Sequence, residues 1–335
     1  DRGRDFFCLP CDCPRGAPEF EFSIYSPSMS LTSQRVPCNS SLCQSDCPTA
    51  NQCPYKIAYV SADTSSSGIL VEDVLYLTTE DEVVEAQIIF GCGQVQTGSF
   101  LNVAAPNGLF GLGMEKISVP SLLATTGLTS DSFSMCFGPD GVGRISFGDK
   151  GSSDQEETPF TPNPTYNISI TGMAIGNSID TEFSALFDSG TSFTYLADPF
   201  YTHLSGSFDS QVLDKRDTRI PFEYCYDMSF NSTQIPSVTL TARGGSQFPV
   251  SEPTIIIPIL QHESVYCLAV LKSNTLNIIG QNFMTGMRIV FDRERMILGW
   301  KQFNCNVEES SSLPIYPQNS PPTISVGPSS YNPEA

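Results

Sequence analysis

One short motif occurs twice in this chain and constrains its fold more than any other feature. Residues 188–193 read Asp-Ser-Gly-Thr-Ser-Phe and residues 1–6 read Asp-Arg-Gly-Arg-Asp-Phe, with a leucine three positions after each phenylalanine. Further along each half, two apolar residues precede a glycine, at 109–111 and at 278–280. The chain therefore reads as two copies of one unit. A pseudo-twofold arrangement would bring one carboxylate from each half to a shared interface, where the two can share a proton.

The second copy resembles the catalytic loop of the pepsin-like aspartic proteases, which reads Asp-Thr/Ser-Gly-Thr/Ser. The apolar run 185–187 leads into Asp188 as a buried strand would. Ser189 stands where the family braces its two loops against each other, and Thr191 where a hydroxyl bonds the catalytic carboxylate. The resemblance implies a mostly β, bilobal fold, with two pseudo-twofold related β lobes and an active-site cleft between them.

The resemblance also implies a function and a set of site residues. The implied activity is that of an aspartic endopeptidase, which hydrolyses polypeptide substrates at acid pH through a water held between two carboxylates. No cofactor and no metal are expected. The implied catalytic pair is Asp1 and Asp188, and the residues expected beside the substrate are Gly3, Gly190, Ser189 and Thr191.

The first copy departs from the family pattern. Arg2 and Arg4 stand where the family has two hydroxyl residues, and no apolar strand precedes Asp1. A guanidinium near a carboxylate favours its charged form, typically by about 1–3 pKa units, so the pair would lack a proton to donate. Two interpretations stay open. The chain is an active protease truncated at its amino end, where a signal peptide and propeptide are expected, or it is a peptide-binding protein without catalysis.

Tyr59 is the candidate flap residue. It ends the run 55–59 just before a polar turn at 61–67, and a returning strand begins at Gly68, as in a β-hairpin. In the resembled family, such a hairpin covers bound peptide and excludes water. Tyr55 lies four residues earlier, on the same face of an extended strand, and is the alternative.

Charge and missing motifs exclude several function classes. The chain has 17 basic and 36 acidic residues among 335, a net charge of -19, which argues against nucleic-acid or anionic-membrane binding. The acidity suits an acidic compartment or serves solubility. The chain contains neither Gly-x-Ser-x-Gly nor His-Glu-x-x-His, and its two histidines lie far apart. We expect a monomer, since the groove is built within one chain.

Twelve cysteines and three glycosylation sequons indicate an oxidising compartment. The predicted glycosylation sites are Asn39, Asn167 and Asn231. We therefore expect passage through the secretory pathway and an extracellular, cell-surface or vacuolar destination.

The cysteine spacing favours disulfides over a metal. Four cysteines lie close together, but the histidines are distant and an oxidising milieu disfavours thiolate ligands. Local disulfides are expected among Cys38, Cys43, Cys47 and Cys53, with connectivity left open, and Cys225 and Cys267 are plausible partners in the second half. The cysteine-rich insertion resembles the nepenthesin-like branch of plant aspartic proteases, and this resemblance implies that Cys136 and Cys305 tie the lobes together.

Short β-branched and aromatic runs predict strands through most of the chain. Two short helices are expected, near 120–124 and 198–204, the second with Asp198 as its cap. Prolines around 159–164 predict a boundary between an N-terminal lobe (1–160) and a C-terminal lobe (161–305). Residues 306–335 are rich in Ser and Pro and are predicted to be disordered. Related plant proteases carry a lipid-anchor signal beyond such a tail, which leaves an anchor open for a longer parent protein.

Overall fold

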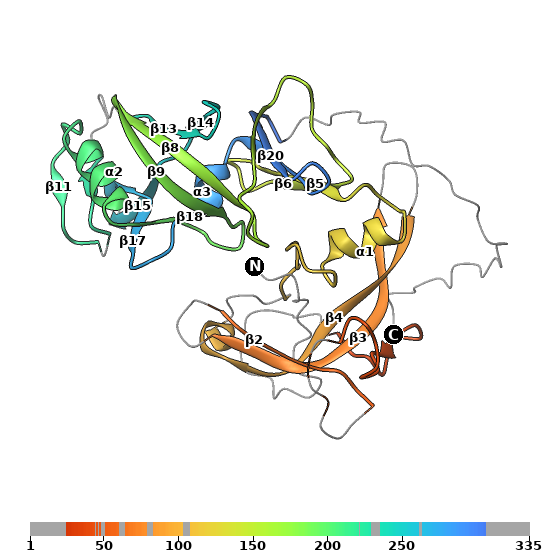
Figure 1. The fold of residues 1–335 in the computed structure, drawn as a ribbon. Coiled ribbons are helices and arrows are strands. Elements are labelled where there is room, and N and C mark those ends of the chain that lie inside the picture. The colour runs from red at the N-terminus through yellow and green to blue at the C-terminus, as the bar shows by residue number, and fades with distance from the viewer. Residues whose placement is uncertain are drawn as a thin grey trace.

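The computed structural model describes residues 25–43, 45, 47, 51–59, 64–78, 83–102, 108–220, 222–228, 235–260 and 263–305. Within them, strands form most of the regular structure and the helices are short. The mostly β architecture expected from the sequence is confirmed. Figure 1 shows two bodies, with β2, β3 and β4 together in one and most strands of the second half in the other.

The first body is an antiparallel sheet built on one long ribbon. β3 pairs with β4 along its length, and β1 and β2 also pair with β3. Helix α1 packs on β4 through Val119, Leu123 and Ala86. Disulfides Cys38–Cys47 and Cys43–Cys53 close the segment before β2. The elements are β1 (Gln34–Arg35), β2 (Pro54–Ala58), β3 (Ser65–Thr78), β4 (Val83–Thr97), η1 (Gly98–Asn102) and α1 (Val119–Thr125).

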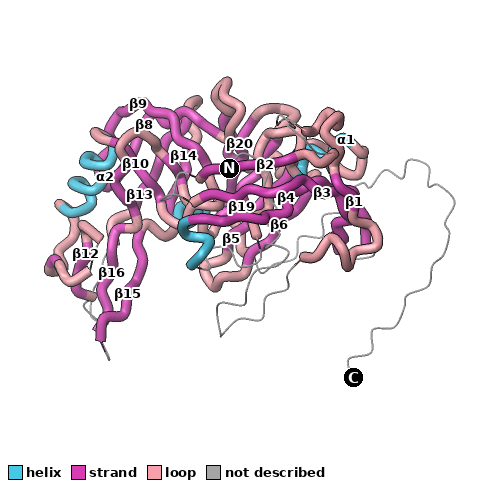
Figure 2. The backbone as a smooth tube through the Cα atoms, turned by 90° about the horizontal axis from the view of Figure 1, so that it is seen from below, coloured by secondary structure: helices cyan, strands magenta, loops and turns pink. Residues whose placement is uncertain are grey.

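A second sheet takes strands from both halves of the chain. Its order is β6-β5-β19-β20-β7, and β5, β6 and β19 run side by side in Figure 2. Arg288 on β19 forms a fork with Asp149, with Nε 3.0 Å from Oδ2 and Nη2 2.7 Å from Oδ1. A disulfide joins Cys136 on β5 to Cys305. The strands are β5 (Ser132–Phe137), β6 (Gly143–Phe147), β7 (Glu156–Pro159), β19 (Met287–Asp292) and β20 (Ile297–Gln302).

The second body contains a seven-stranded sheet with the order β14-β13-β8-β9-β18-β10-β17. The largest hydrophobic cluster lies against it and includes Phe187, Phe248 and Trp300. The strands are β8 (Asn167–Ile175), β9 (Asn177–Phe187), β10 (Thr194–Ala197), β13 (Val238–Ala242), β14 (Gln247–Val250), β17 (Val270–Ser273) and β18 (Ile278–Ile279).

A smaller four-stranded sheet, β11-β12-β16-β15, extends from one end of this body, where β15 and β16 project as a hairpin (Figure 2). The disulfide Cys225–Cys267 joins paired positions of β12 and β16. The strands are β11 (Arg216–Asp217), β12 (Cys225–Asp227), β15 (Thr254–Leu260) and β16 (Glu263–Leu268).

Two helices complete the second body, α2 (Phe200–Asp209) and α3 (Gln281–Met284). The prediction that Asp198 caps α2 was wrong. Pro199, which has no side-chain acceptor, occupies the cap position in its place. Asp198 lies one residue outside, where its carboxylate accepts the Thr202 hydroxyl at 2.7 Å and pairs with Lys272.

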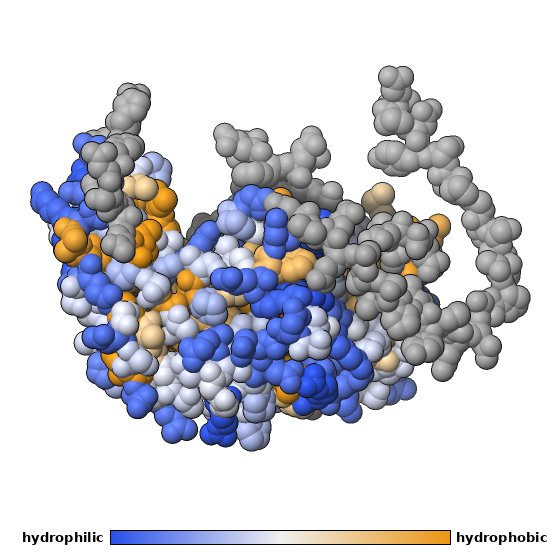
Figure 3. All heavy atoms as spheres, turned by 90° about the horizontal axis from the view of Figure 1, so that it is seen from above, coloured by the Kyte–Doolittle hydropathy of each residue, from blue (hydrophilic) through white to orange (hydrophobic). Residues whose placement is uncertain are grey.

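The described surface is mainly polar. Viewed from above, apolar side chains appear as patches among polar ones (Figure 3). Most large apolar groups lie instead in the clusters beneath the sheets.

One buried carboxylate ties the segment before β1 to the long ribbon. Asp73 on β3 is 6% exposed. It accepts hydroxyl hydrogen bonds from Tyr25 and Thr32, each at 2.5 Å, and its own strand donates the Val74 N–H at 2.8 Å. Burial alone would raise the pKa of Asp73, but these hydrogen bonds outweigh it and lower the pKa to about 2.

We expect Asp73→Asn to lower the free energy of unfolding by about 1–3 kcal/mol near pH 6, because the hydroxyls of half-buried Tyr25 and of Thr32 lose a charged acceptor. The folded pKa of Asp73 lies below its unfolded value, so this stabilisation is complete above the unfolded value and is lost as the pH falls toward 2. Urea unfolding from pH 6 to pH 2 should show the two proteins converging in acid. Asp180→Asn, at an exposed site on β9, is the control. A difference that stays constant with pH would contradict the assignment.

Candidate active site

Asp188 follows directly on β9, at a point where the strand order is unusual. β18 lies between β9 and β10, parallel to β9 and antiparallel to β10. The Asp188 N–H continues the ladder by donating to the Ile279 carbonyl at 3.0 Å. Residues 188–193 join β9 to β10 and therefore have to cross the end of β18.

The loop holds both carboxylate oxygens of Asp188. The Gly190 N–H donates to Oδ1 at 2.9 Å and the Thr191 hydroxyl donates to Oδ2 at 2.7 Å. The Thr191 N–H also donates to the Asp188 carbonyl at 3.2 Å, which closes a tight turn. Hydrogen bonds to an ionised acceptor are strong and directional, so the plane of this half-buried carboxylate is fixed by its own loop.

The start of α3 holds the loop from behind. The N–H groups of Gln281 and Asn282 donate to the carbonyls of Thr191 and Ser192, at 2.8 and 3.2 Å. A methyl group added at Gly280 would overlap the Phe193 carbonyl and would lie 2.9 Å from the Thr191 oxygen. The apolar-apolar-Gly motif of the second half is thus a point of close backbone contact.

Asp188 opens onto a small, mainly apolar pocket with walls from both halves of the chain. Asp188 and Ser189 form one side, with Leu186 and Phe187 of β9 beside them. The first half contributes the segment that follows its own apolar-apolar-Gly motif. The residues from that segment are Leu112, Gly113 and Met114, with Phe110 from the motif itself. The structure therefore places the apolar-apolar-Gly motif of the first half beside the Asp188 pocket.

Tyr59 lies at the turn end of the β2–β3 hairpin, one residue beyond β2. Its N–H donates to the Thr64 carbonyl at 2.8 Å, and its half-buried ring meets Phe100 edge-on at 5.2 Å. Tyr55 is instead 4% exposed, and its hydroxyl shares a 2.8 Å hydrogen bond with Ser66. Tyr59 is thus the less buried of the two tyrosines, and it is not on the wall of the Asp188 pocket in the described part of the chain.

Several sequence predictions fall outside the described residues. These are Asp1, Gly3, the sequon at Asn231 and the tail 306–335. Asn39 is exposed, whereas the half-buried Asn167 donates its amide to the Ser184 hydroxyl at 3.2 Å. Within the described ranges, no group of three potential ligands could hold a metal ion. No helix there has the length and apolar character needed to cross a membrane.

Comparison with known proteins places the chain in a family. Residues 1–149 match the family described as Xylanase inhibitor N-terminal, and residues 165–302 match Xylanase inhibitor C-terminal. Aspartyl protease family protein 1 of Arabidopsis thaliana is 53% identical over 359 residues, covering 100% of this chain and 70% of the relative. The chain belongs to the pepsin-like aspartic protease family of plants. Aspartic proteinase-like protein 1 of the same species is 38% identical over 97% of this chain and 67% of its own length.

Solved structures confirm the fold of this aspartic protease family member. Basic 7S globulin from soybean superimposes with a TM-score of 0.69 at 23% identity, covering 84% of this chain and 83% of the globulin. Conglutin gamma from lupine seeds gives 0.69 at 21% identity, covering 90% and 86%. At this level of identity, the likeness shows the bilobal pepsin-like fold alone.

Sequence reasoning missed the residues behind the pocket of this family member. Arg293 and Tyr166 contact the first-half pocket segment, with Tyr166 donating its hydroxyl to the Leu112 carbonyl at 2.6 Å. Both come from the second half, more than fifty positions away in sequence. The available signal was a basic residue two positions after the apolar run 289–291, in a chain poor in basic residues.

We expect Gly280→Ala to lower the free energy of unfolding by about 1–3 kcal/mol, because the added methyl group forces backbone apart at the crossing. Thermal unfolding by circular dichroism measures the effect. Gly206→Ala in α2 is the matched control, since nothing lies within 4 Å of its added carbon. The control should be neutral or slightly stabilising. Equal effects of the two substitutions would contradict the close contact at Gly280.

Proposed function

We propose that this protein is an aspartic endopeptidase that hydrolyses polypeptides at acid pH. The observation that carries the proposal is the Asp188 loop. Its carboxylate is held on both oxygens, at 2.9 and 2.7 Å, and opens onto a pocket walled by both halves of the chain. The Arabidopsis relatives named as aspartyl proteases support the same conclusion.

In the proposed mechanism, Asp188 works with Asp1, its counterpart in the duplicated motif. Two carboxylates facing each other share one proton, since ionising both is costly. One takes a proton from a water that attacks the peptide carbonyl, and the other donates a proton to the carbonyl oxygen. Thr191 and Gly190 keep the Asp188 oxygens oriented throughout. No cofactor or metal enters these steps.

The pocket supports a substrate class. Leu112, Met114 and Leu186 present apolar walls next to Asp188, so apolar side chains next to the cleaved bond are favoured. The β2–β3 hairpin carrying Tyr59 closes over the bound peptide in this proposal, and the groove is complete within one monomer.

Arg2 and Arg4 favour a second candidate function. In this alternative, the two arginines keep both carboxylates charged, so the groove binds peptides without cutting them. The two candidates differ in catalysis and agree on peptide binding.

We expect the protein to cleave a denatured protein substrate between about pH 3 and 6 and pepstatin to block the cleavage. Asp188→Asn should abolish it by removing the carboxylate that is proposed to exchange protons. Asp180→Asn, on the β9 surface, should leave it unchanged. Mass spectrometry of the products measures the cleavage and its preferred side chains.

If the folded protein binds pepstatin but cleaves nothing, the second candidate function is favoured, in which the groove binds peptides without cutting them. In that case, Arg2→Thr with Arg4→Ser should restore cutting if the two cations are the cause. Cleavage that persists in Asp188→Asn would overturn the proposal.

We also propose that the protein passes through the secretory pathway to the cell exterior, the cell surface or the vacuole. A lipid anchor on a longer parent protein is compatible with this proposal. Four disulfides in the described residues support this destination.

We expect exposed Asn39 to carry a glycan, which would appear as a mobility shift when protein from a plant secretory host is treated with N-glycosidase. Asn39→Gln should remove one shift, whereas Asn51→Gln, also exposed but outside any sequon, should not. An unchanged pattern in Asn39→Gln would count against this site.

A further inference from the structure

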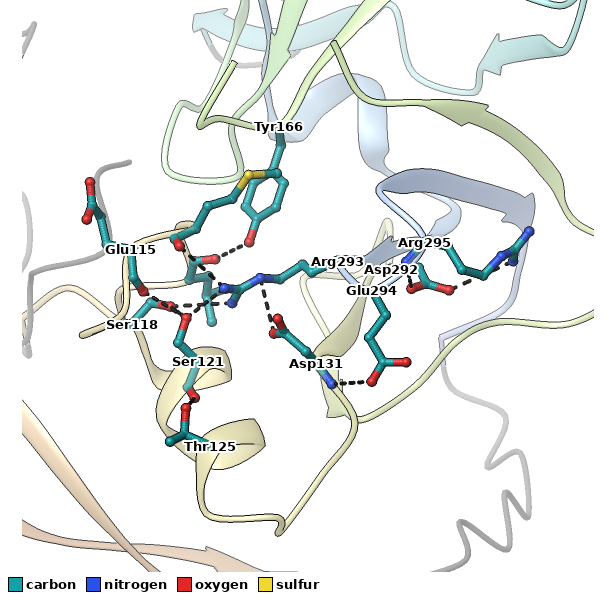
Figure 4. A network of polar contacts seen from close by, with 12 residues as sticks. Glu115, Ser118, Ser121, Thr125, Asp131, Tyr166, Asp292, Arg293, Glu294 and Arg295 are labelled. Atoms are coloured by element: carbon teal, nitrogen blue, oxygen red, sulfur yellow. Dashed lines mark hydrogen bonds and ion pairs between the residues drawn. The ribbon is translucent and has the colours of Figure 1, made fainter. Parts of the chain in front are cut away.

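Arg293 reaches from the second half of the chain into the first. It lies in the turn between β19 and β20, and its side chain is 6% exposed. In Figure 4 its guanidinium points toward Ser118 and toward Ser121 in the first turn of α1, and Tyr166 lies above it in this view. A nearly buried guanidinium requires a full set of acceptors.

Most of those acceptors come from the segment 111–121. The Nη2 atom donates to the Ser121 hydroxyl at 2.6 Å and to the Met114 carbonyl at 3.5 Å, and Nη1 donates to the Ser118 hydroxyl at 3.4 Å. Ser121 in turn donates to the Glu115 carbonyl at 2.8 Å. Residues 112–117 form neither helix nor strand, so these bonds to a side chain from the other half define much of their course.

The same segment forms the first-half wall of the Asp188 pocket. Leu112, Gly113 and Met114 line it, and the buried Tyr166, which lines it too, donates to the Leu112 carbonyl. Burial raises the pKa of the Tyr166 hydroxyl, so it remains a donor. Arg293 thus sits directly behind the wall that faces the carboxylate, without reaching the pocket itself.

The contacts of Arg293 with this segment do not titrate, because hydroxyl and carbonyl oxygens accept them. Its one charged partner among the described residues is Asp131, with Nε 3.2 Å from Oδ1. Burial raises the pKa of Asp131, Arg293 opposes this, and the nearby Glu294 and Asp292 add to it. Acid therefore weakens the ion pair but leaves the bonds to the 111–121 segment intact.

We propose that Arg293 is a positioning residue that holds the 111–121 segment in register with the Asp188 loop, so that the two walls of the active-site pocket keep their spacing at acid pH. This inference rests on the proposed peptidase function for its catalytic consequence. Its structural part stands on the contacts of Arg293 alone.

The test compares Arg293→Met and Arg293→Lys with Arg295→Met, a control from the same turn whose side chain is 54% exposed and pairs with Glu157 at 2.8 Å. We expect Arg293→Met to lower kcat/KM by about ten- to a hundredfold at acid pH, a cost typical of slight misplacement around a reacting centre. The loss should appear in kcat when kcat is expressed per active site, with the number of active sites counted by pepstatin titration. Arg293→Lys keeps the charge and the fold but cannot reach Ser121 and Met114 together, so its activity should be intermediate. Asp131→Asn, which mimics the protonated acid form, should stay within about twofold of wild type.

Hydrogen exchange of residues 111–121 supplies a readout independent of activity. Exchange there should accelerate in Arg293→Met and Arg293→Lys, with the Arg295→Met pattern unchanged. Unchanged exchange in both Arg293 variants, or a kcat per titrated site equal to wild type, would overturn the inference. If wild-type protein cuts nothing, the peptidase proposal fails, and hydrogen exchange alone decides whether Arg293 positions the segment. If Arg293→Met does not fold, the kinetic measurement and the hydrogen-exchange measurement are both made on Arg293→Lys.

Discussion

The insertion of β18 between β9 and β10 is the constraint on which the candidate active site depends. Because β9 and β10 are not neighbours, the loop 188–193 must cross the end of β18, and at Gly280 the crossing leaves room only for backbone. The same crossing places the first N–H groups of α3 against the loop carbonyls. A slip of β18 would move the whole loop. Strand order therefore fixes where the Asp188 carboxylate points.

The five-stranded sheet that contains strands from both halves fixes the position of the other wall of the pocket relative to Asp188. The Arg288–Asp149 fork joins β19 to the first half beside β5, and the Cys136–Cys305 disulfide closes the same end. Phe133 and Phe291, which line the pocket from the two halves, stack with ring centroids 4.7 Å apart. A buried ion pair often adds little net stability. Its fixed geometry instead suits a role in holding the two halves in one register.

A fall in pH has opposite effects on the stability contributed by two carboxylates, Asp73 and Asp131. Asp73 has a lowered pKa, so its hydrogen bonds to Tyr25 and Thr32 survive until the pH approaches 2. Asp131 has a raised pKa because burial outweighs Arg293, so protonating it favours the folded chain as the pH falls. Neither change removes the contacts of Arg293 with the 111–121 segment, because those contacts end on hydroxyl and carbonyl oxygens.

The sequence by itself determined the β-rich fold class, the internal duplication and the chemistry of the Asp188 loop, because these depend on local patterns: a strand, a turn and neighbouring hydroxyls. It also predicts a flap role for Tyr59, which lies at the turn end of its hairpin while Tyr55 is buried. Only the tertiary structure decided that Pro199 displaces Asp198 from the cap of α2, which disulfides form among the clustered cysteines, and that Arg293 supports the far wall of the pocket. The contacts of Arg293 join residues distant in sequence, whereas the cap and the local disulfides depend on the path of the backbone, which residue spacing alone does not encode.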